Sequence, residues 1–354
     1  MKKSTHSGGS HFKRACHLFT FLLFGLVFML AACGSAAVAN SPTAVPATNP
    51  PATEAIAQAT AVPTDTVEPT KMPTETAVPP TAEPTATPPP SATPIPSPTA
   101  IPETQIVNGI PLSEFLIMPE NVQENVRDIY ARGKTQLRNP RAFSKIGDSV
   151  VLTPHFLARF DSDNYNLGIY DYLQPTIDQF AGSFSRYGQA AHVGLSFRTM
   201  YELGWPDEKF CEPEEDIVAC EIRTNNPSIF IIRLGTNDQV PAAMEANLRK
   251  LLEDLMAQGI VPILSTKNDR FDDEKNVNNQ IIRDLSVEYA VPLWDFDLLA
   301  DTMPLRGLSG DGIHLTMHDT NDYTNPEVLE RGYPVNDLTA LMILDTILKT
   351  VDQQ

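Results

Sequence analysis

Short, mainly apolar runs alternate with amphipathic segments along the C-terminal 70% of the chain. The apolar runs, which predict buried strands, are residues 142–146, 190–195, 228–234, 260–265 and 291–296. The amphipathic segments, which have helical spacing, are residues 120–136, 173–181, 242–258, 276–289 and 336–351. Apolar strands alternating with helices are typical of a central parallel sheet covered on both faces. We therefore predict one α/β domain, a three-layer α/β/α sandwich, over residues 104–354.

The region before this domain has no such pattern. Residues 34–103 consist largely of Pro, Thr and Ala with scattered Glu, as in TAVPPTAEPTATPPPSATPIPSPT, and offer few large apolar side chains to bury. A segment of this composition cannot form a packed core, and its prolines favour the polyproline II conformation. We predict a disordered linker. It has about 70 residues, and at a rise of ~3.1 Å per residue its fully extended length would be at most ~200 Å.

The first 33 residues have the layout of a secretory signal. Basic side chains precede an apolar run, LFTFLLFGLVFMLAA, at residues 18–32. The run ends in Leu30-Ala31-Ala32-Cys33, which resembles the lipobox of bacterial lipoproteins, where the cysteine is acylated and becomes the new N-terminus. We expect a lipid anchor at Cys33 that holds the domain on the extracytoplasmic face of the cell membrane. An uncleaved signal anchor is the alternative, because the run is close to the shortest length that spans a bilayer.

The net charge of the chain excludes one class of partner, and its cysteines predict a disulfide. The formal net charge is -18, and the domain has no cluster of Lys and Arg, so nucleic acid is excluded as a partner. Of the four cysteines, only Cys211 and Cys220 lie in the predicted domain. In an exported protein they should form a disulfide, which would stabilise the fold by about 2 to 3 kcal/mol. We expect the domain to be a monomer.

Polar residues with catalytic chemistry follow two of the predicted strands and recur near the C-terminus. The first strand leads into Gly147-Asp148-Ser149, the strand at 228–234 leads into Gly235-Thr236-Asn237-Asp238, and a late loop reads Asp311-Gly312-Ile313-His314. A lone Gly-Asp-Ser is an ordinary turn. Strand ends of a parallel sheet, however, share one edge where ligands bind. There Asp311 could orient His314 to take a proton from Ser149, and the Asn237 amide could stabilise an oxyanion.

These three segments resemble the Ser, Asn and Asp-His blocks of the SGNH (GDSL-like) hydrolase superfamily, over about residues 139–347. The resemblance implies a flavodoxin-like fold, no metal or cofactor, and hydrolysis of esters through an acyl-enzyme. It also implies that Ser149 is the nucleophile, His314 the base, Asp311 its partner and Asn237 an oxyanion donor.

One block departs from the family pattern. The stretch that usually supplies a glycine N–H, with a pattern like NxxxSG, is matched here by residues 192–197, HVGLSF, in which the glycine is displaced. We expect the oxyanion hole to use the N–H groups of Ser149 and Gly194 with the Asn237 amide, and the N–H of Phe197 is the alternative to Gly194.

The sequence predicts a serine ester hydrolase that acts on acyl esters, such as O-acetyl groups of a polysaccharide or a small molecule. An acyltransferase with the same triad and a non-catalytic surface binding module are the alternatives. The domain has no G-x-G-x-x-G segment for a nucleotide cofactor and no G-x-S-x-G elbow. Residues 161–164, DSDN, begin like a calcium loop but lack its glycine and its final glutamate. Three further histidines, His155, His192 and His318, compete with His314.

Overall fold

A mixed five-stranded sheet forms the centre of the domain. The computed structural model describes residues 101–353 apart from 153, 272 and 274. The predicted signal peptide, with Cys33, and nearly all of the predicted linker lie outside the described residues. Within the described part of the chain, no helix combines the length and the apolar character needed to cross a bilayer.

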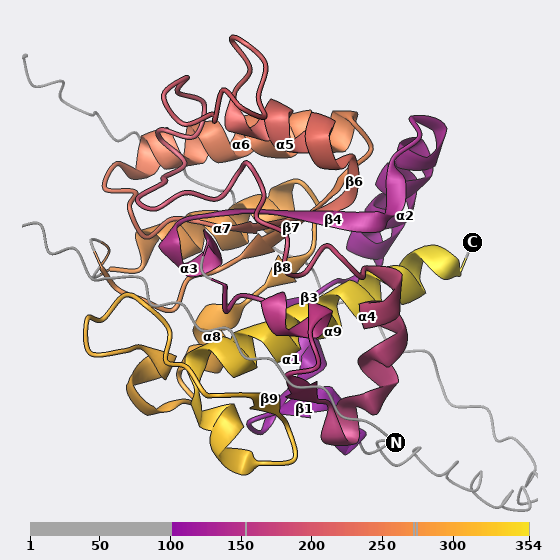
Figure 1. Cartoon of the computed structure of the whole chain (residues 1–354), viewed down its shortest axis with the longest axis vertical. Coiled ribbons are helices and arrows are strands. Elements are labelled where there is room, and N and C mark those ends of the chain that lie inside the picture. The colour runs from indigo at the N-terminus through magenta and orange to yellow at the C-terminus, as the bar shows by residue number, and fades with distance from the viewer. Residues whose placement is uncertain (1–100, 153, 272, 274, 354) are drawn as a thin grey trace, which may run out of the picture. The chain divides into compact units, whose positions relative to one another are not determined.

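The order of the strands places the ends of β4 and β6 side by side (Figure 1). Across the sheet, the strands are β3 (Leu116–Ile117), β8 (Leu293–Trp294), β7 (Val261–Ser265), β6 (Pro227–Arg233) and β4 (Asn139–Gly147). The last four are parallel, as predicted, whereas β3 runs antiparallel to β8. The predicted central parallel sheet is confirmed, and the antiparallel edge strand β3 was not predicted because a two-residue strand leaves no pattern in the sequence.

The apolar run at 190–195 does not form the predicted strand. Only Ala191 pairs in parallel with Gly147, and the chain then turns, with the N–H of Leu195 donating to the carbonyl of His192 (3.2 Å). With this bridge in place of a second strand, the order across the parallel sheet is the flavodoxin-like 2-1-3-4-5. The chain changes direction between β4 and β6, which is the position where such sheets bind ligands.

Two side chains and the short backbone bridge, instead of a full strand, cover the outer edge of β4. Gln179 Nε2 donates to the carbonyl of Pro140 (2.9 Å), and the Arg186 guanidinium donates to the carbonyl of Phe143. Farther along, the N–H of His192 donates to the carbonyl of Gly147 (3.1 Å). Three carbonyls of the strand that leads to Ser149 are thus bonded on this side by the last residue of α4, by a loop arginine and by the backbone of the bridge.

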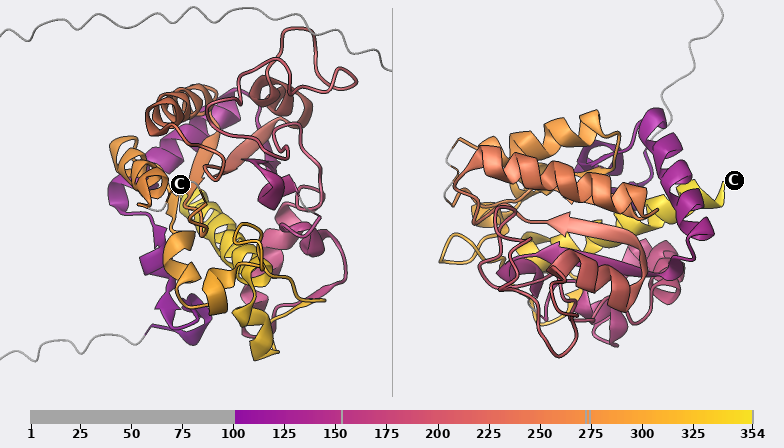
Figure 2. Two further views of the ribbon diagram at one scale, coloured as in Figure 1. Left: turned by 90° about the vertical axis from the view of Figure 1, so that its left-hand side faces the viewer. Right: turned by 90° about the horizontal axis from the view of Figure 1, so that it is seen from above.

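Helices cover both faces of the sheet (Figures 1 and 2). One layer contains α2 (Glu120–Thr135), α4 (Gln174–Gln179) and α9 (Gly332–Asp352), and the other contains α5 (Ile217–Asn225), α6 (Pro241–Ala257) and α7 (Val277–Glu288). Alternate residues of β6 divide between the two layers: Ile229 and Ile231 pack into the first core, and Phe230 and Ile232 into the second. This alternation explains why the strand is apolar from Ile229 to Ile232.

The helices correspond to most of the predicted amphipathic segments. Those at 120–136, 242–258, 276–289 and 336–351 are α2, α6, α7 and α9, and the segment at 173–181 is mainly α4. Helix α5 was not predicted, although Asp216 caps it by accepting hydrogen bonds from the N–H groups of Val218 and Ala219 (2.9 Å each).

The remaining elements are short. They are η1 (Glu103–Gln105), β1 (Ile106–Val107), β2 (Ile110–Pro111), α1 (Leu112–Phe115), α3 (Ser149–Leu152), η2 (Ala158–Asp161), β5 (Tyr165–Asn166), η3 (Gly168–Leu173), α8 (Phe296–Ala300), η4 (Pro304–Gly307), β9 (Asn321–Asp322) and η5 (Pro326–Glu330). Two of them matter for the site: α3 begins at Ser149, and η4 precedes the loop that contains Asp311 and His314.

Candidate active site

Ser149 is presented by a tight turn between β4 and α3. A side chain at Gly147 would collide with the Val151 side chain and with the carbonyl of Arg233, so this position requires glycine. Asp148 holds the turn: its Oδ1 accepts the N–H of Val150 (2.9 Å), and its carbonyl accepts the N–H of Val151 (3.1 Å). Ser149 itself is half-buried, at the edge of the sheet where the parallel strands end.

Asp311 and His314 lie on a short hairpin, which we call the histidine hairpin, residues 307–316. Leu308 and Leu315 pair in antiparallel fashion, and the N–H of Ser309 donates to the carbonyl of His314 (2.8 Å). Gly312 has φ +73°, a left-handed conformation that glycine adopts without strain. The hairpin therefore fixes the backbone that separates the carboxylate from the imidazole.

Hydrogen bonds keep the Asp311 carboxylate ionised. Oδ1 accepts the N–H groups of Ile313 and His314 (3.0 Å each) and the Ser309 hydroxyl (2.7 Å). The Ile313 N–H, followed by the His314 ring and the Ser309 hydroxyl, holds the pKa of Asp311 well below its usual range. Asp311 is therefore a permanent acceptor for the imidazole.

His314 connects Asp311 to Ser149. Its Nδ1 lies 2.7 Å from Asp311 Oδ2, and its Nε2 lies 2.9 Å from Ser149 Oγ. Because Asp311 can only accept, Nδ1 carries the proton, and a neutral His314 presents the lone pair of Nε2 to the serine hydroxyl. The His314 and Asp311 side chains are 44% and 49% exposed, so the chain of hydrogen bonds is open to solvent.

The residues expected to bind an oxyanion surround the turn at 192–195. Asn237 follows β6, and its Nδ2 donates to the carbonyl of Leu195 (2.9 Å), which fixes the orientation of the amide. Gly194 is exposed, with φ +77°. Within the described part of the chain, the N–H groups of Ser149 and Gly194 have no hydrogen-bond partner. The N–H of Phe197 donates to Asp238 Oδ2 (2.9 Å), so Phe197, the alternative to Gly194, is already engaged.

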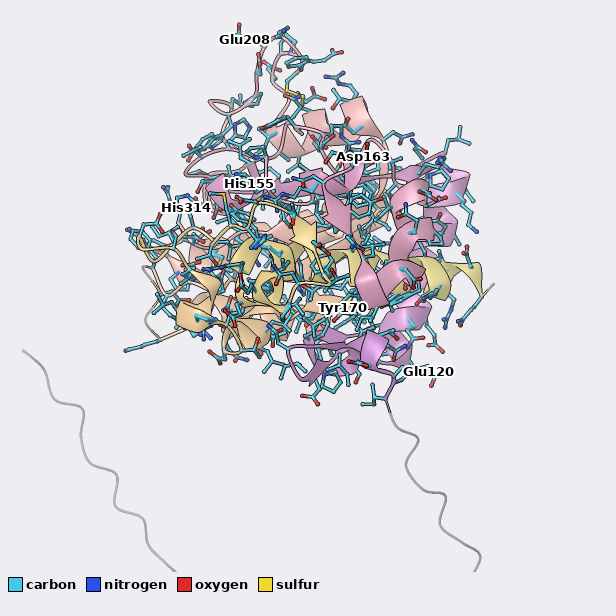
Figure 3. All side chains as sticks on the ribbon, turned by 60° about the horizontal axis from the view of Figure 1, so that its bottom comes forward. Glu120, His155, Asp163, Tyr170, Glu208 and His314 are labelled. Carbon is cyan, nitrogen blue, oxygen red and sulfur yellow. A yellow bond between two sulfur atoms is a disulfide. The ribbon has the colours of Figure 1, made fainter. Side chains whose placement is uncertain are left out.

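The other histidines have different surroundings. The His155 ring lies 5.6 Å from the Tyr333 ring, and burial, followed by the charge of Arg159, lowers the pKa of His155. His192 Nε2 bonds to the carbonyl of Gln189 (2.7 Å), and His318 Nδ1 bonds to the Thr320 backbone (3.1 Å to the carbonyl). In the view of Figure 3, His155 and His314 both lie toward the same side of the domain.

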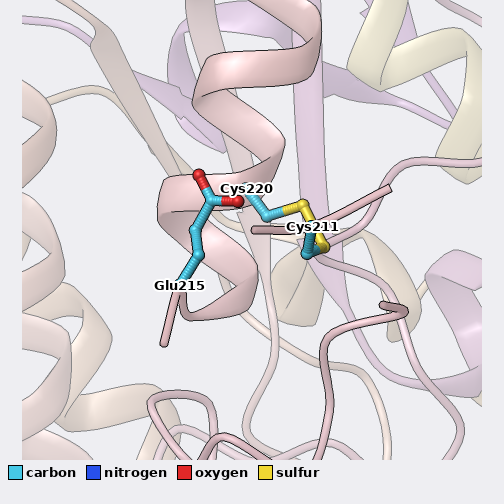
Figure 4. A group of neighbouring side chains, drawn as sticks. All are labelled: Cys211, Glu215 and Cys220. Carbon is cyan, nitrogen blue, oxygen red and sulfur yellow. A yellow bond between two sulfur atoms is a disulfide. The ribbon is translucent and has the colours of Figure 1, made fainter. Parts of the chain in front are cut away.

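The two domain cysteines form a disulfide (Figure 4). Cys211 and Cys220 have Cα atoms 5.2 Å apart, and the bridge joins the loop before α5 to the first half of that helix. Glu215 lies beside them, but the two sulfur atoms are bonded to each other and so are not free to hold a metal. Asp161, in the predicted calcium-like segment, accepts the N–H groups of Gly182 and Ser185 (2.7 Å each).

Several polar residues around the site were not found from the sequence. Asp238 accepts the N–H groups of Phe197 and Arg198 (2.9 and 3.1 Å) and thereby fixes the segment after the Gly194 turn. Arg233 and Asn268 lie buried beneath the serine turn. The one signal for them is a charged residue at the end of an otherwise apolar strand, SIFIIR, which indicates a buried partner.

Comparison with known proteins gave structural likenesses alone. No family model matches the chain, and no curated protein matches it. Solved structures similar to part of it include an acetyl esterase mutant with an acetate ion, at 14% identity, covering 60% of this chain and 100% of that one with a TM-score of 0.38. A GDSL-like lipase from Bacteroides thetaiotaomicron is 13% identical, covering 64% of this chain and 98% of that one, with a TM-score of 0.35. A catalytic mutant of an acetylxylan esterase from Geobacillus stearothermophilus is 13% identical, covering 61% and 96%, with a TM-score of 0.34. Likenesses this low do not establish the family of the chain.

Proposed function

We propose that the domain is a serine ester hydrolase of the SGNH type, with Ser149 as nucleophile, His314 as general base and Asp311 as its partner. The observation that carries the proposal is the continuous hydrogen-bonded chain from Asp311 through His314 to Ser149. The order of the GDS, GTND and DGIH segments along the chain supports the SGNH assignment.

The proposed reaction has two steps. His314 Nε2 takes the proton of Ser149 as Oγ bonds to the acyl carbon, and the carbonyl electron pair moves to the oxygen. The N–H groups of Ser149 and Gly194 and the Asn237 amide donate to this oxyanion. When the carbonyl re-forms, the ester C–O bond breaks and His314 protonates the leaving alcohol. His314 then deprotonates a water molecule, which attacks the acyl-enzyme and releases the carboxylic acid and free Ser149.

We propose that the substrates are acyl esters on bulky molecules, such as O-acetyl groups of a polysaccharide. The exposure of His314 and Asp311 supports this, because an open site accepts a short acyl group while the rest of a large substrate stays in solvent. The proposed location, tethered to the membrane through Cys33, is supported by the basic residues, the apolar run and the lipobox-like segment of the sequence.

The test measures release of p-nitrophenol from acetyl and butyryl esters by the full chain in detergent. Hydrolysis by the wild type that disappears in Ser149→Ala, but persists in the surface control Ser162→Ala, would support the proposal. A fluorophosphonate should label Ser149, and peptide mass spectrometry would identify the labelled residue. Equal activity in wild type and Ser149→Ala would refute it. For the tether, mass spectrometry should find acyl chains on Cys33 of the wild type, which then forms the N-terminus, and should find the apolar run still attached and no acyl chain in Cys33→Ser.

A further inference from the structure

Ser149, at the turn after β4, and His314, on the histidine hairpin, are 165 residues apart in the sequence. The buried side-chain amide of Asn268 lies between two arginines, Arg233 and Arg306, that are each next to one of these segments. Asn268, which follows β7, is 2% exposed. Its Oδ1 accepts a hydrogen bond from Arg233 Nη2 (3.1 Å), and its Nδ2 donates to the carbonyl of Arg306 (3.0 Å). Its own carbonyl accepts Arg306 Nε (3.0 Å). One residue therefore contacts two arginines that belong to different parts of the site.

Arg233 supports the serine turn. It ends β6 opposite Gly147, and its guanidinium, packed 4.5 Å from the centre of the Phe296 ring, also donates to the carbonyl of Thr266 (2.9 Å). Arg233 and Asp148 line the same small cavity. Burial lowers the pKa of Arg233 to about 10, and the nearby charge of Asp148 opposes this shift. Burial raises the pKa of Asp148, whose carboxylate holds the N–H of Val150, and the charge of Arg233 opposes that rise.

Arg306 supports the histidine hairpin. Leu305 and Arg306 have φ values of 50° and 60°, a left-handed conformation that such residues keep only when their surroundings impose it. The next residue, Gly307, begins the hairpin, and its carbonyl accepts the N–H of Thr316 (2.8 Å). The Arg306 guanidinium also pairs with Asp297. The two bonds to Asn268 hold both the main chain and the side chain of Arg306 at this entry point.

We propose that Asn268 is a positioning residue that sets the distance between Ser149 Oγ and His314 Nε2 by joining Arg233 to Arg306. This inference rests on the proposed function, because it concerns the geometry of the same proton transfer. An amide is suited to the position since it accepts from a guanidinium and donates to a carbonyl at the same time. Aspartate could accept from Arg233 but could not donate to Arg306, and leucine could do neither.

The kinetic test compares substitutions at Asn268 with matched substitutions elsewhere. A displacement of about 1 Å costs about 10²-fold in rate, so Asn268→Leu should lower kcat about 10²-fold, and Asn268→Asp about tenfold, with KM changed less than about threefold. Asn125 is the control for lost hydrogen bonds: its Nδ2 donates to the carbonyls of Tyr289 and Ala290 (3.0 Å each), before β8 at the opposite end of the strands. Leu252→Ala, in a core helix, is the control for lost stability.

Wild type and Ser149→Ala are assayed first, so that failure of the proposed function is seen separately. Unchanged kcat in Asn268→Leu, or an equal loss in Asn125→Leu and Leu252→Ala, would overturn the role of Asn268. If Asn268→Leu does not fold, wild-type kcat in Asn268→Asp would overturn it equally. Amide hydrogen exchange needs no activity: it should accelerate together at 149–152 and 307–316 in the Asn268 variants and in neither control. Faster exchange in one segment alone would contradict the coupling.

Discussion

Replacing Asp311 by asparagine changes one atom of the site in a way that the surrounding hydrogen bonds make predictable. Oδ1 accepts three hydrogen bonds, from the N–H groups of Ile313 and His314 and from the Ser309 hydroxyl, whereas Oδ2 faces the imidazole alone. The amide oxygen of the variant must occupy the Oδ1 position, because an NH2 group there would face three donors. The NH2 group therefore points at His314 Nδ1.

An NH2 donor at this position reverses the tautomer of His314. Nδ1 becomes the acceptor, the proton moves to Nε2, and Nε2 can no longer take the proton of Ser149. Serine hydrolases lose about 10⁴-fold in kcat from this change, which corresponds to about 5 kcal/mol of transition-state stabilisation. We expect a loss of that size in Asp311→Asn, with little change in KM, because the carboxylate contacts the imidazole and not the substrate.

The assay is steady-state hydrolysis of p-nitrophenyl acetate, with Ser149→Ala as the baseline. Asp322→Asn is a matched control: this loop aspartate accepts the N–H and the hydroxyl of Thr324 (3.1 and 2.6 Å) but has no bond to the triad residues. Retention of more than about a tenth of kcat in Asp311→Asn, or a similar loss in Asp322→Asn, would refute the tautomer argument.

Three further predictions follow from other parts of the structure. Asn237→Ala should lower kcat about 10² to 10³-fold with KM nearly unchanged, and wild-type kcat would remove Asn237 from the oxyanion hole. Burial lowers the pKa of Lys145 to about 8, so the stability tied to its neutral form is present above pH 10.5 and is lost as the pH falls through 8. Between pH 7 and 10, urea unfolding of the wild type should gain up to about 3 kcal/mol relative to Lys145→Met, and parallel pH profiles would contradict this. Replacing Cys211 and Cys220 by serine should cost about 2 to 3 kcal/mol in the same measurement, and dithiothreitol should reproduce the loss in wild type alone.

The sequence predicted those parts of the fold whose residues follow a regular period. Strand β6 and helix α6 repeat their apolar positions over enough residues to be recognised. The run at 190–195 is apolar for another reason: Ala190 and Leu195 are buried in the second core without pairing along a strand. Helix α5 was missed because its first residues lie inside the short acidic segment that the disulfide closes.

The residues of the candidate site also divide into those that the sequence predicts and those that it does not. Ser149, Asn237, Asp311 and His314 were found because each lies in a short motif, so local sequence was sufficient. Asn268 belongs to no motif, and its partners lie 35 and 38 residues away in the sequence. Buried polar networks of this kind depend on which loops the fold brings together, and the sequence alone does not give that information.

The contacts along the outer edge of β4 have a consequence for self-association of the protein. An uncovered edge strand is a template to which a strand of another chain can add. Here the carbonyls of Pro140, Phe143 and Gly147 are already taken by Gln179, Arg186 and the N–H of His192. The outer edge of the strand that leads to Ser149 is thereby protected from edge-to-edge aggregation by two side-chain contacts and one short backbone bridge.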